Sequence, residues 1–281
     1  MLLFCGCQRT APLSSEFIRS SWFRYQIRSH AVLWCRNEPG KCPCKISAAT
    51  LFGFNSHRTV KEFQLPQDDN QAKAGDDELS LPGQGLTKEQ AFFRILDGHW
   101  RYVDNQRKSV QTTSEDRSRH AQGQFPFAAI LGCADSRVSP EVIFDQGQGD
   151  LFVVRVAGNV VGDFEQASLE YAVGQLGVKL VIVMGHEQCG AVKAAITHDG
   201  STDAGALGRL LNEILPAVIE IRGGEGDVLS KAVRGNVCHS VDVLLKRSTF
   251  LRESVDNGVL RVIGLVYDLA SGDLDIQRTE G

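Results

Sequence analysis

The sequence predicts an α/β domain in which a central, mostly parallel sheet is flanked by helices. Three short apolar runs, at residues 126–133, 150–159 and 179–186, are each too brief for a typical helix and each contain a glycine at or near their end. Such runs are typical of strands that are buried on both faces. Helical patterns separate the later runs and follow the last one, and strands that alternate with helices favour parallel pairing.

The predicted domain begins with an amphipathic helix. Thr87, with Gln90 three residues later, forms the pattern of a capping box. The apolar side of this helix, which we expect to end near Val103, carries Ala91, Ile95 and Leu96.

The remaining elements continue the alternation. Asp163 can cap a helix that runs through Leu176, and Gly177 stands where the C-terminus of a helix favours a left-handed residue. Further helical patterns occupy residues 189–197, 208–221 and 231–246. A terminal pair of strands is predicted at residues 260–269 and 274–276, around Ser271 and Gly272.

Composition restricts the classes of function. A chain of 281 residues with 42% apolar residues can bury a sizeable core. The net charge of -4 gives no basis for nucleic acid or an acidic membrane as partner, so a small or neutral substrate fits better. The longest apolar stretches, such as residues 180–184, are far shorter than the roughly 20 residues of a membrane-spanning helix. We therefore expect no nucleic acid partner and no membrane insertion.

The N-terminal part differs from the rest. Residues 1–62 carry nine Lys and Arg against three acidic residues, with many serines, which resembles an organelle transit peptide. A disordered extension or a start codon assigned too far upstream fits equally well. Residues 64–85 are polar, acidic and broken by Pro and Gly, as in a linker. We divide the chain into an extension and linker at 1–85 and a folded domain at 86–281. We expect a cytoplasmic protein, or an organelle-matrix protein if residues 1–62 are a transit peptide.

The eight cysteines are neither dense nor regular enough for a disulfide scaffold. Cys42-Pro43-Cys44 could be a small metal or redox site. It lacks a partner histidine or a second pair at zinc spacing, so an incidental pair is the better interpretation.

Three of the potential metal ligands follow predicted strands. Cys133 ends the first apolar run, His186 ends the third, and Cys189 follows three residues later. Because ligand sites of open parallel sheets lie outside the carboxyl ends of the strands, these side chains can converge. Two thiolates and an imidazole suit zinc, and three protein ligands leave a fourth position for water, as in catalytic zinc sites. Each cysteine alone could be inert core, and the pair could be a redox couple, but the neighbouring histidine and carboxylate favour a metal.

A carboxylate and a guanidinium lie next to the first cysteine. Cys133, Asp135 and Arg137 alternate along the chain, so an extended backbone would point all three to one side. Arg137 could then keep Asp135 ionised through a bidentate pair, ready to accept a hydrogen bond from zinc-bound hydroxide. The alternative is a turn pair that only shapes the loop.

Several motifs together resemble the β-carbonic anhydrases. They are CADSR at 133–137, PEVIFD at 140–145, GDLFVVRVAGN at 149–159, HEQCGA at 186–191 and VYDLASG at 266–272. The resemblance covers about residues 87–277 and has every motif in order. It implies the β-carbonic anhydrase fold, one zinc ion per chain on Cys133, His186 and Cys189, and the Asp135/Arg137 dyad. It also implies a homodimer or higher even oligomer with active sites at subunit interfaces.

The resemblance also implies a substrate pocket. The residues that match the pocket of the plant-like β-carbonic anhydrases are Gln124, Phe152, Ala157 and Tyr171, and Gly190 would supply a backbone N–H. Several of these pocket residues would come from the neighbouring subunit. An aromatic residue within an α/β pattern can instead be core.

Two departures from the family pattern concern positions near the first cysteine. Ala134 replaces a common serine, and Ile130 stands where the bicarbonate-inhibited subgroup carries tryptophan. We therefore expect no such inhibitory site. By the same resemblance, we expect Asp135 to pair with Arg137 rather than to ligate zinc.

The implied reaction is the reversible hydration of carbon dioxide to bicarbonate and a proton. Zinc would lower the pKa of bound water to about 7, giving hydroxide as nucleophile, while Gln124 and the Gly190 N–H could stabilise the oxygens of the forming bicarbonate. His198 and His239 are conceivable proton shuttles, or merely solvated. Two rival functions are a hydrolase of carbon disulfide or carbonyl sulfide and a noncatalytic bicarbonate-binding protein. The presence of Asp135 and Arg137 speaks against the second.

Overall fold

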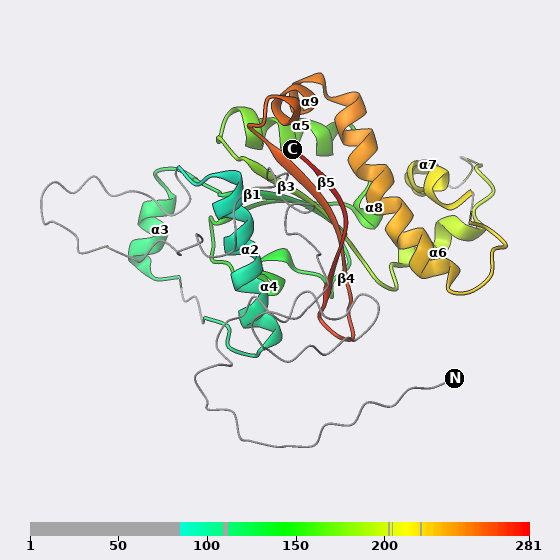
Figure 1. Ribbon diagram of the computed structural model, residues 1–281, viewed down its shortest axis with the longest axis horizontal. Coiled ribbons are helices and arrows are strands. Elements are labelled where there is room, and N and C mark those ends of the chain that lie inside the picture. Colours follow the sequence, from blue (N-terminus) through cyan, green and yellow to red (C-terminus); the bar gives the residue numbers. More distant parts are fainter. Residues whose placement is uncertain (1–84, 109–111, 202, 204, 220) are drawn as a thin grey trace, which may run out of the picture. The chain divides into compact units, whose positions relative to one another are not determined.

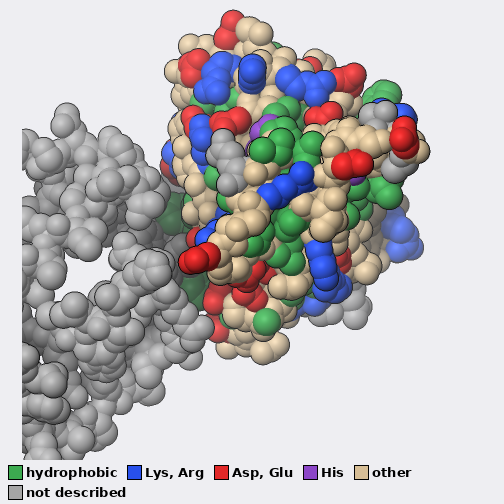
Figure 2. Space-filling model, turned by 90° about the vertical axis from the view of Figure 1, so that its right-hand side faces the viewer, with side chains coloured by type: hydrophobic (Ala, Val, Ile, Leu, Met, Phe, Trp, Pro, Cys, Tyr) green, Lys and Arg blue, Asp and Glu red, His purple; other side chains and the backbone are tan. Residues whose placement is uncertain are grey.

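The computed structural model describes residues 85–281, except 109–111, 202, 204 and 220 (Figure 1). The predictions for the transit-like segment, for most of the linker and for Cys42-Pro43-Cys44 lie outside the described residues. Among the residues that are described, no helix has both the length and the apolar character needed to cross a membrane. The face shown in Figure 2 mixes basic, acidic and apolar side chains.

A five-stranded sheet forms the centre of the domain. Its strands are β1 (Ala128–Gly132), β2 (Leu151–Arg155), β3 (Leu180–His186), β4 (Arg261–Tyr267) and β5 (Leu274–Glu280). Their order is β2-β1-β3-β4-β5. Every pair is parallel except β4 with β5. All residues of β1 and β3 are buried, which explains their unbroken apolar sequences. The prediction of a mostly parallel sheet flanked by helices is confirmed.

Helices cover both faces of this sheet. They are α2 (Lys88–Val103), α3 (Ser114–His120), α4 (Pro140–Ile143), α5 (Asp163–Gly174), α6 (Gly190–Thr197), α7 (Gly205–Ile219), α8 (Val228–Arg247) and α9 (Thr249–Asp256), with a 3₁₀ turn, η3 (Ala157–Asn159), after β2. Figure 1 shows α6, α7 and α8 grouped together, away from α2 and α4.

The core is divided into two layers by the period of two along the strands. Ala128 and Ile130 of β1 belong to the layer that contains residues of α2 and α4. Ala129 and Leu131 belong to the layer that contains residues of α5, α6, α7, α8 and α9. Cys133 and Cys189 belong to this second layer, so the two candidate sulfur ligands lie on the same side of the sheet.

The element boundaries confirm most sequence predictions. The capping box of Thr87 and Gln90 is formed, and Gly177 has a left-handed φ of 72°. One correction concerns α5: Gly162 is its N-cap, and Asp163 is its first helical residue. The Glu165 side chain accepts the Gly162 N–H, so the cap does not need a side-chain oxygen at the N-cap itself.

Three helices of the described part of the chain were not predicted. The α3 sequence, SEDRSRH, has no apolar stripe, and none of its residues is buried, so hydrophobic periodicity could not predict this helix. The α4 helix has only four residues and begins at Pro140. The α9 helix buries only Leu251 and Val255, which is too weak a pattern to recognise between two stronger elements.

Candidate metal centre

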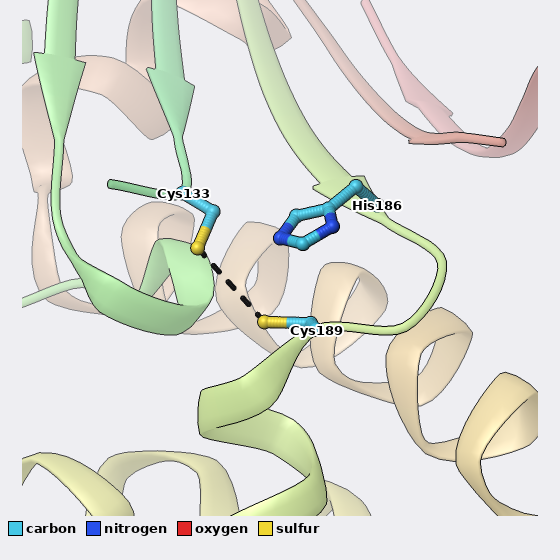
Figure 3. Close-up of side chains that lie close together, drawn as sticks. All are labelled: Cys133, His186 and Cys189. Atoms are coloured by element: carbon cyan, nitrogen blue, oxygen red, sulfur yellow. Dashed lines mark hydrogen bonds between the residues drawn. The ribbon is translucent and has the colours of Figure 1, made fainter. Parts of the chain in front are cut away.

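Three side chains with soft or borderline donors meet at the carboxyl edge of the sheet. Cys133 follows β1, His186 is the last residue of β3, and Cys189 is the N-cap of α6. Because β1 and β3 pair in parallel, with Gly132 beside Met184, their ends meet. The ligand atoms of the three side chains all lie within 4.8 Å of one another, and all three residues are buried (Figure 3). The sequence-predicted ligands are therefore brought together.

The hydrogen bonding of His186 fixes which of its nitrogens is free. Its Nδ1 lies 2.9 Å from the backbone oxygen of Glu187. A carbonyl can only accept, so Nδ1 carries the proton and Nε2 keeps its lone pair. Nε2 is buried and has no hydrogen-bond partner among the described residues. Metal-ligating histidines use this arrangement, with one nitrogen donating to a carbonyl and the other facing the metal.

The spacing of the two sulfurs fits a metal better than a disulfide. Cys133 Sγ and Cys189 Sγ are 3.9 Å apart. A disulfide bond is about 2.05 Å long, whereas two sulfurs on a tetrahedral zinc, each about 2.3 Å from it, are about 3.8 Å apart. The donor set of two thiols and one imidazole is also a zinc set.

The two thiols differ in acidity. The pKa of Cys133 is lowered to about 4, chiefly because the Cys189 thiol hydrogen-bonds to it; burial opposes this shift, and the Gly158 N–H, 3.3 Å from the sulfur, supports it. The pKa of Cys189 is raised because it holds the shared proton and is buried. One thiolate thus forms readily, and a metal would have to displace one further proton.

Asp135 and Arg137 form a bidentate pair beside these ligands. Arg137 Nε donates to Oδ1 at 2.9 Å and Nη2 to Oδ2 at 2.7 Å. The expected extended backbone is wrong beyond Asp135, because the chain turns at Ser136 and Arg137, and the Arg137 N–H also donates to Oδ1. The pairing therefore forms across a turn.

This pair places a carboxylate charge at the rim of the metal centre. The Arg137 side chain holds the pKa of Asp135 well below its usual range. Asp135 Oδ2 lies 3.7 Å from His186 Nε2. Asp135 is therefore ionised, engaged with Arg137 and next to the ligand atoms.

Sequence reasoning missed Arg155, which holds the loop after β1. Its Nε donates to the Cys133 carbonyl at 3.0 Å, and its Nη2 donates to the Asp135 carbonyl at 2.6 Å. Arg155 is the one charged residue within an apolar run, FVVRVA, and that position was the available signal.

The predicted pocket residues are only partly gathered within one chain. The rings of Phe152 and Tyr171 lie 6.2 Å apart, and Tyr171 is 49% exposed. Ala157 opens η3, whose next residue contacts Cys133, and Gly190 opens α6 directly after Cys189. Gln124 lies elsewhere, in the lining of a cavity of about 260 Å³ formed with α3 and residues 147–150.

The two candidate proton shuttles are also placed. His198 ends α6, and its Nε2 lies 3.1 Å from the Asn212 side-chain oxygen. His239 lies within α8. Neither belongs to the group of three that could hold a metal.

The sequence is similar to a known protein family and to individual proteins. The family model for carbonic anhydrase matches residues 128–274, more than half of the chain. Carbonic anhydrase 2 of Mycobacterium tuberculosis is 38% identical over 187 residues, which cover 65% of this chain and 89% of that protein. The carbonic anhydrase of Mycolicibacterium smegmatis is 34% identical, over 66% of this chain and 92% of that protein.

Solved structures show the same similarity. A Coccomyxa β-carbonic anhydrase in complex with acetazolamide matches with a TM-score of 0.54 and 28% identity, over 66% of this chain and 86% of that chain. A tetrameric β-carbonic anhydrase from Sordaria macrospora matches with a TM-score of 0.54 and 25% identity, over 68% of this chain and 98% of that chain.

Proposed function

The chain belongs to the β class of carbonic anhydrases, and on this premise we propose that it hydrates carbon dioxide reversibly to bicarbonate and a proton with one zinc ion per chain. Cys133, His186 and Cys189 would hold the metal. The observation that carries the proposal is the buried Nε2 of His186, which has no hydrogen-bond partner in the described part of the chain and lies with two sulfurs within 4.8 Å. An unpaired buried acceptor is costly, and a metal would satisfy it.

The chemistry depends on both the metal and the dyad. A zinc ion held there would supply the Lewis acidity that brings the pKa of a bound water to about 7. Asp135, kept ionised by Arg137, offers Oδ2 as an acceptor for an O–H donor beside His186. Arg137 is itself bonded to the Gln188 carbonyl at 3.3 Å, so the acceptor is fixed from two loops. Such preorganisation orients a nucleophile at little entropic cost during the reaction.

We propose that carbon dioxide binds against Phe152, Ala157 and Tyr171, with the Gly190 N–H as a donor to oxygen. Gly190 stands at the start of α6, where backbone N–H groups have no acceptor within the helix.

Gln124 would complete the pocket from a neighbouring subunit, because within one chain it lines a different cavity. This separation supports a homodimer or higher even oligomer. Its test is the mass of the purified protein in solution: a monomer with full activity would contradict it.

The function is tested by stopped-flow hydration of carbon dioxide, with zinc measured on the same samples. We expect rapid hydration and about one zinc per chain for the wild type. Cys133→Ser should lose both zinc and activity. Asp135→Asn should keep zinc and lose activity by about 100-fold or more, the range typical of a positioned proton acceptor. An Asp135→Asn variant with wild-type hydration would contradict the role of the dyad.

The same samples separate the rival chemistry. Carbon disulfide and carbonyl sulfide would meet the same metal site, so turnover of all three substrates should be compared. A zinc-loaded protein that hydrolyses either sulfur compound but does not hydrate carbon dioxide would replace the proposed function with that of a hydrolase.

We propose a cytoplasmic location, with the organelle matrix as the alternative if residues 1–62 act as a transit peptide. Cell fractionation, with mass spectrometry of the mature N-terminus, distinguishes the two. Loss of the first residues in an organelle fraction would favour the alternative.

A further inference from the structure

Two successive carbonyls after β3 orient the candidate metal centre. The carbonyl of Glu187 accepts the Nδ1 proton of His186 at 2.9 Å. The carbonyl of Gln188 accepts from Arg137 Nη2 at 3.3 Å. The first bond sets the ring orientation of a proposed zinc ligand, and the second helps to place the guanidinium of the dyad. The backbone of Glu187 and Gln188 is therefore the common support of both.

The backbone conformation of Glu187 and Gln188 is not one that these residues favour by themselves. Gln188 has a φ of 56°, in the left-handed region that a residue with a side chain enters at a cost. Such a conformation persists when the surrounding structure over-determines it. The groups that hold Glu187 and Gln188 are therefore part of the support of the metal centre.

Helix α8 holds the segment through the Glu187 side chain. Glu187 Oε1 accepts from Arg234 Nη1 at 2.6 Å and from Ser230 Oγ at 3.1 Å. On the other side, the Glu187 N–H donates to the Tyr267 carbonyl of β4 at 2.9 Å. Only 15% of the Glu187 side chain is exposed, so its pair with Arg234 is shielded more than a surface ion pair.

We propose that Arg234 is a positioning residue for the metal centre: by holding Glu187 on α8, it fixes the two carbonyls that orient His186 and Arg137. The inference rests on the proposed role of His186 as a zinc ligand. According to this proposal, α8 supports the metal centre in addition to covering the sheet. Partners that hydrogen-bond a ligand directly change metal affinity or activity by about 10- to 100-fold when they are removed, and Arg234 acts one contact further from the metal.

Arg234 has a second partner that supplies a matched control. Its Nε and Nη2 lie 3.3 and 3.2 Å from Asp275 Oδ2 on β5. Asp275→Asn weakens that ion pair and leaves the bonds to Glu187 in place. A role limited to joining α8 to the sheet would be disturbed by either change, whereas a positioning role depends on the Glu187 contact alone.

The experiment measures zinc affinity by chelator competition, together with the visible spectrum of the cobalt-substituted protein. We expect Arg234→Met to lower zinc affinity by about 10-fold, the lower end of the range for groups that support a ligand, and to alter the cobalt spectrum, which reports ligand geometry. Arg234→Lys, which keeps a cation opposite Glu187, should recover part of the affinity. Asp275→Asn should stay within about twofold of the wild type, because the Glu187 contact is untouched.

A further variant covers the case in which Arg234→Met does not fold. Glu187→Gln keeps an acceptor for Ser230 and removes the charge opposite Arg234, so it should give an intermediate loss of zinc affinity. Wild-type affinity and cobalt spectra in Arg234→Met, or in Glu187→Gln where Arg234→Met fails to fold, would overturn the proposal. An equal loss in Asp275→Asn would overturn it too.

The failure of the function and the failure of this inference are distinguishable. A wild-type protein that binds zinc through Cys133 but does not hydrate carbon dioxide would overturn the proposed function alone, because zinc affinity still reports on Arg234. A wild-type protein that binds no zinc at this site would overturn both.

Discussion

Two buried histidines of the domain, His99 of α2 and His186 at the end of β3, differ in what their ring nitrogens contact. His99 of α2 is 4% exposed, and its Nδ1 lies 3.2 Å from the Ile143 carbonyl. His186 is fully buried, and its Nδ1 also faces a carbonyl, but its Nε2 has no partner among the described residues. Burial is therefore common to both, and His186 is distinguished as a candidate ligand by an unpartnered nitrogen that lies beside two sulfurs.

The surroundings of the two rings agree with this difference. His99 packs against the aromatic rings of Tyr102 and Phe144, at centroid distances of 6.1 and 6.3 Å. Burial lowers the pKa of His99, and hydrogen bonds to the backbone of Ile143 and Gly272 oppose that shift. It is a neutral core histidine with backbone partners. His186 instead has two sulfurs beside it.

The largest expected contrast comes from replacing each histidine by phenylalanine, which is similar in size and cannot ligate. His186→Phe leaves the Glu187 carbonyl without its partner, and His99→Phe leaves the backbone groups of Ile143 and Gly272 without theirs, at about 1 kcal/mol for each lost hydrogen bond. Only His186→Phe removes a proposed ligand, so it should lose zinc and hydration activity, whereas His99→Phe should keep both. Metal analysis and stopped-flow hydration on the paired variants are the measurements. Zinc retained in His186→Phe would remove the distinction drawn here.

Two glycines allow a second contrast, between stability and metal affinity. A Cβ at Gly98 of α2 would lie 1.8 Å from the Phe144 backbone oxygen, so α2 and α4 would have to separate. Gly98→Ala should therefore destabilise the fold by about 3 kcal/mol, although alanine normally favours a helix by about 1 kcal/mol. Its zinc affinity should be unchanged, because the atoms nearest to the added methyl group belong to Phe144 and Gln146 and not to a candidate ligand.

Gly158 provides the other half of this contrast. It has a φ of 70°, and a Cβ there would lie 2.6 Å from the Ile214 side chain, which can move. Gly158→Ala should cost about 1 to 2 kcal/mol. It should also weaken zinc binding, because the Gly158 N–H contacts Cys133 Sγ. Denaturant unfolding measures the loss of stability, and chelator competition measures the loss of zinc affinity. A larger loss of zinc affinity in Gly98→Ala would reverse the comparison.

The smallest effect concerns pH. The pKa of His99 is lowered from 6.5 in the folded protein, so below about pH 6.5 the unfolded chain binds the proton more readily. Stability should therefore fall as the pH falls through this value, with a slope of at most about 1.4 kcal/mol per pH unit from this group. His99→Phe should show a shallower decline between pH 7.5 and 5.5 in urea unfolding. Parallel curves for the two proteins would show that His99 does not titrate in this window.

The amino-acid sequence alone was enough to predict the α/β class, the buried strands and the meeting of Cys133, His186 and Cys189. These predictions depend on local regularities: an apolar run marks a strand buried on both faces, and parallel strands end at one edge. The Thr87 capping box was readable for the same reason, since its partners are three residues apart.

The support of the metal centre and the free nitrogen of His186 could be recognised only from the folded chain. Arg155 reaches Cys133 across 22 residues of sequence, and Arg234 reaches Glu187 across 47. The turn after Asp135, the hydrogen bond that fixes the His186 tautomer and the distant position of Gln124 also appear only in three dimensions. Hydrophobic periodicity is a property of neighbours along the chain, whereas these contacts depend on how packed elements place side chains against one another, and no local pattern encodes that placement.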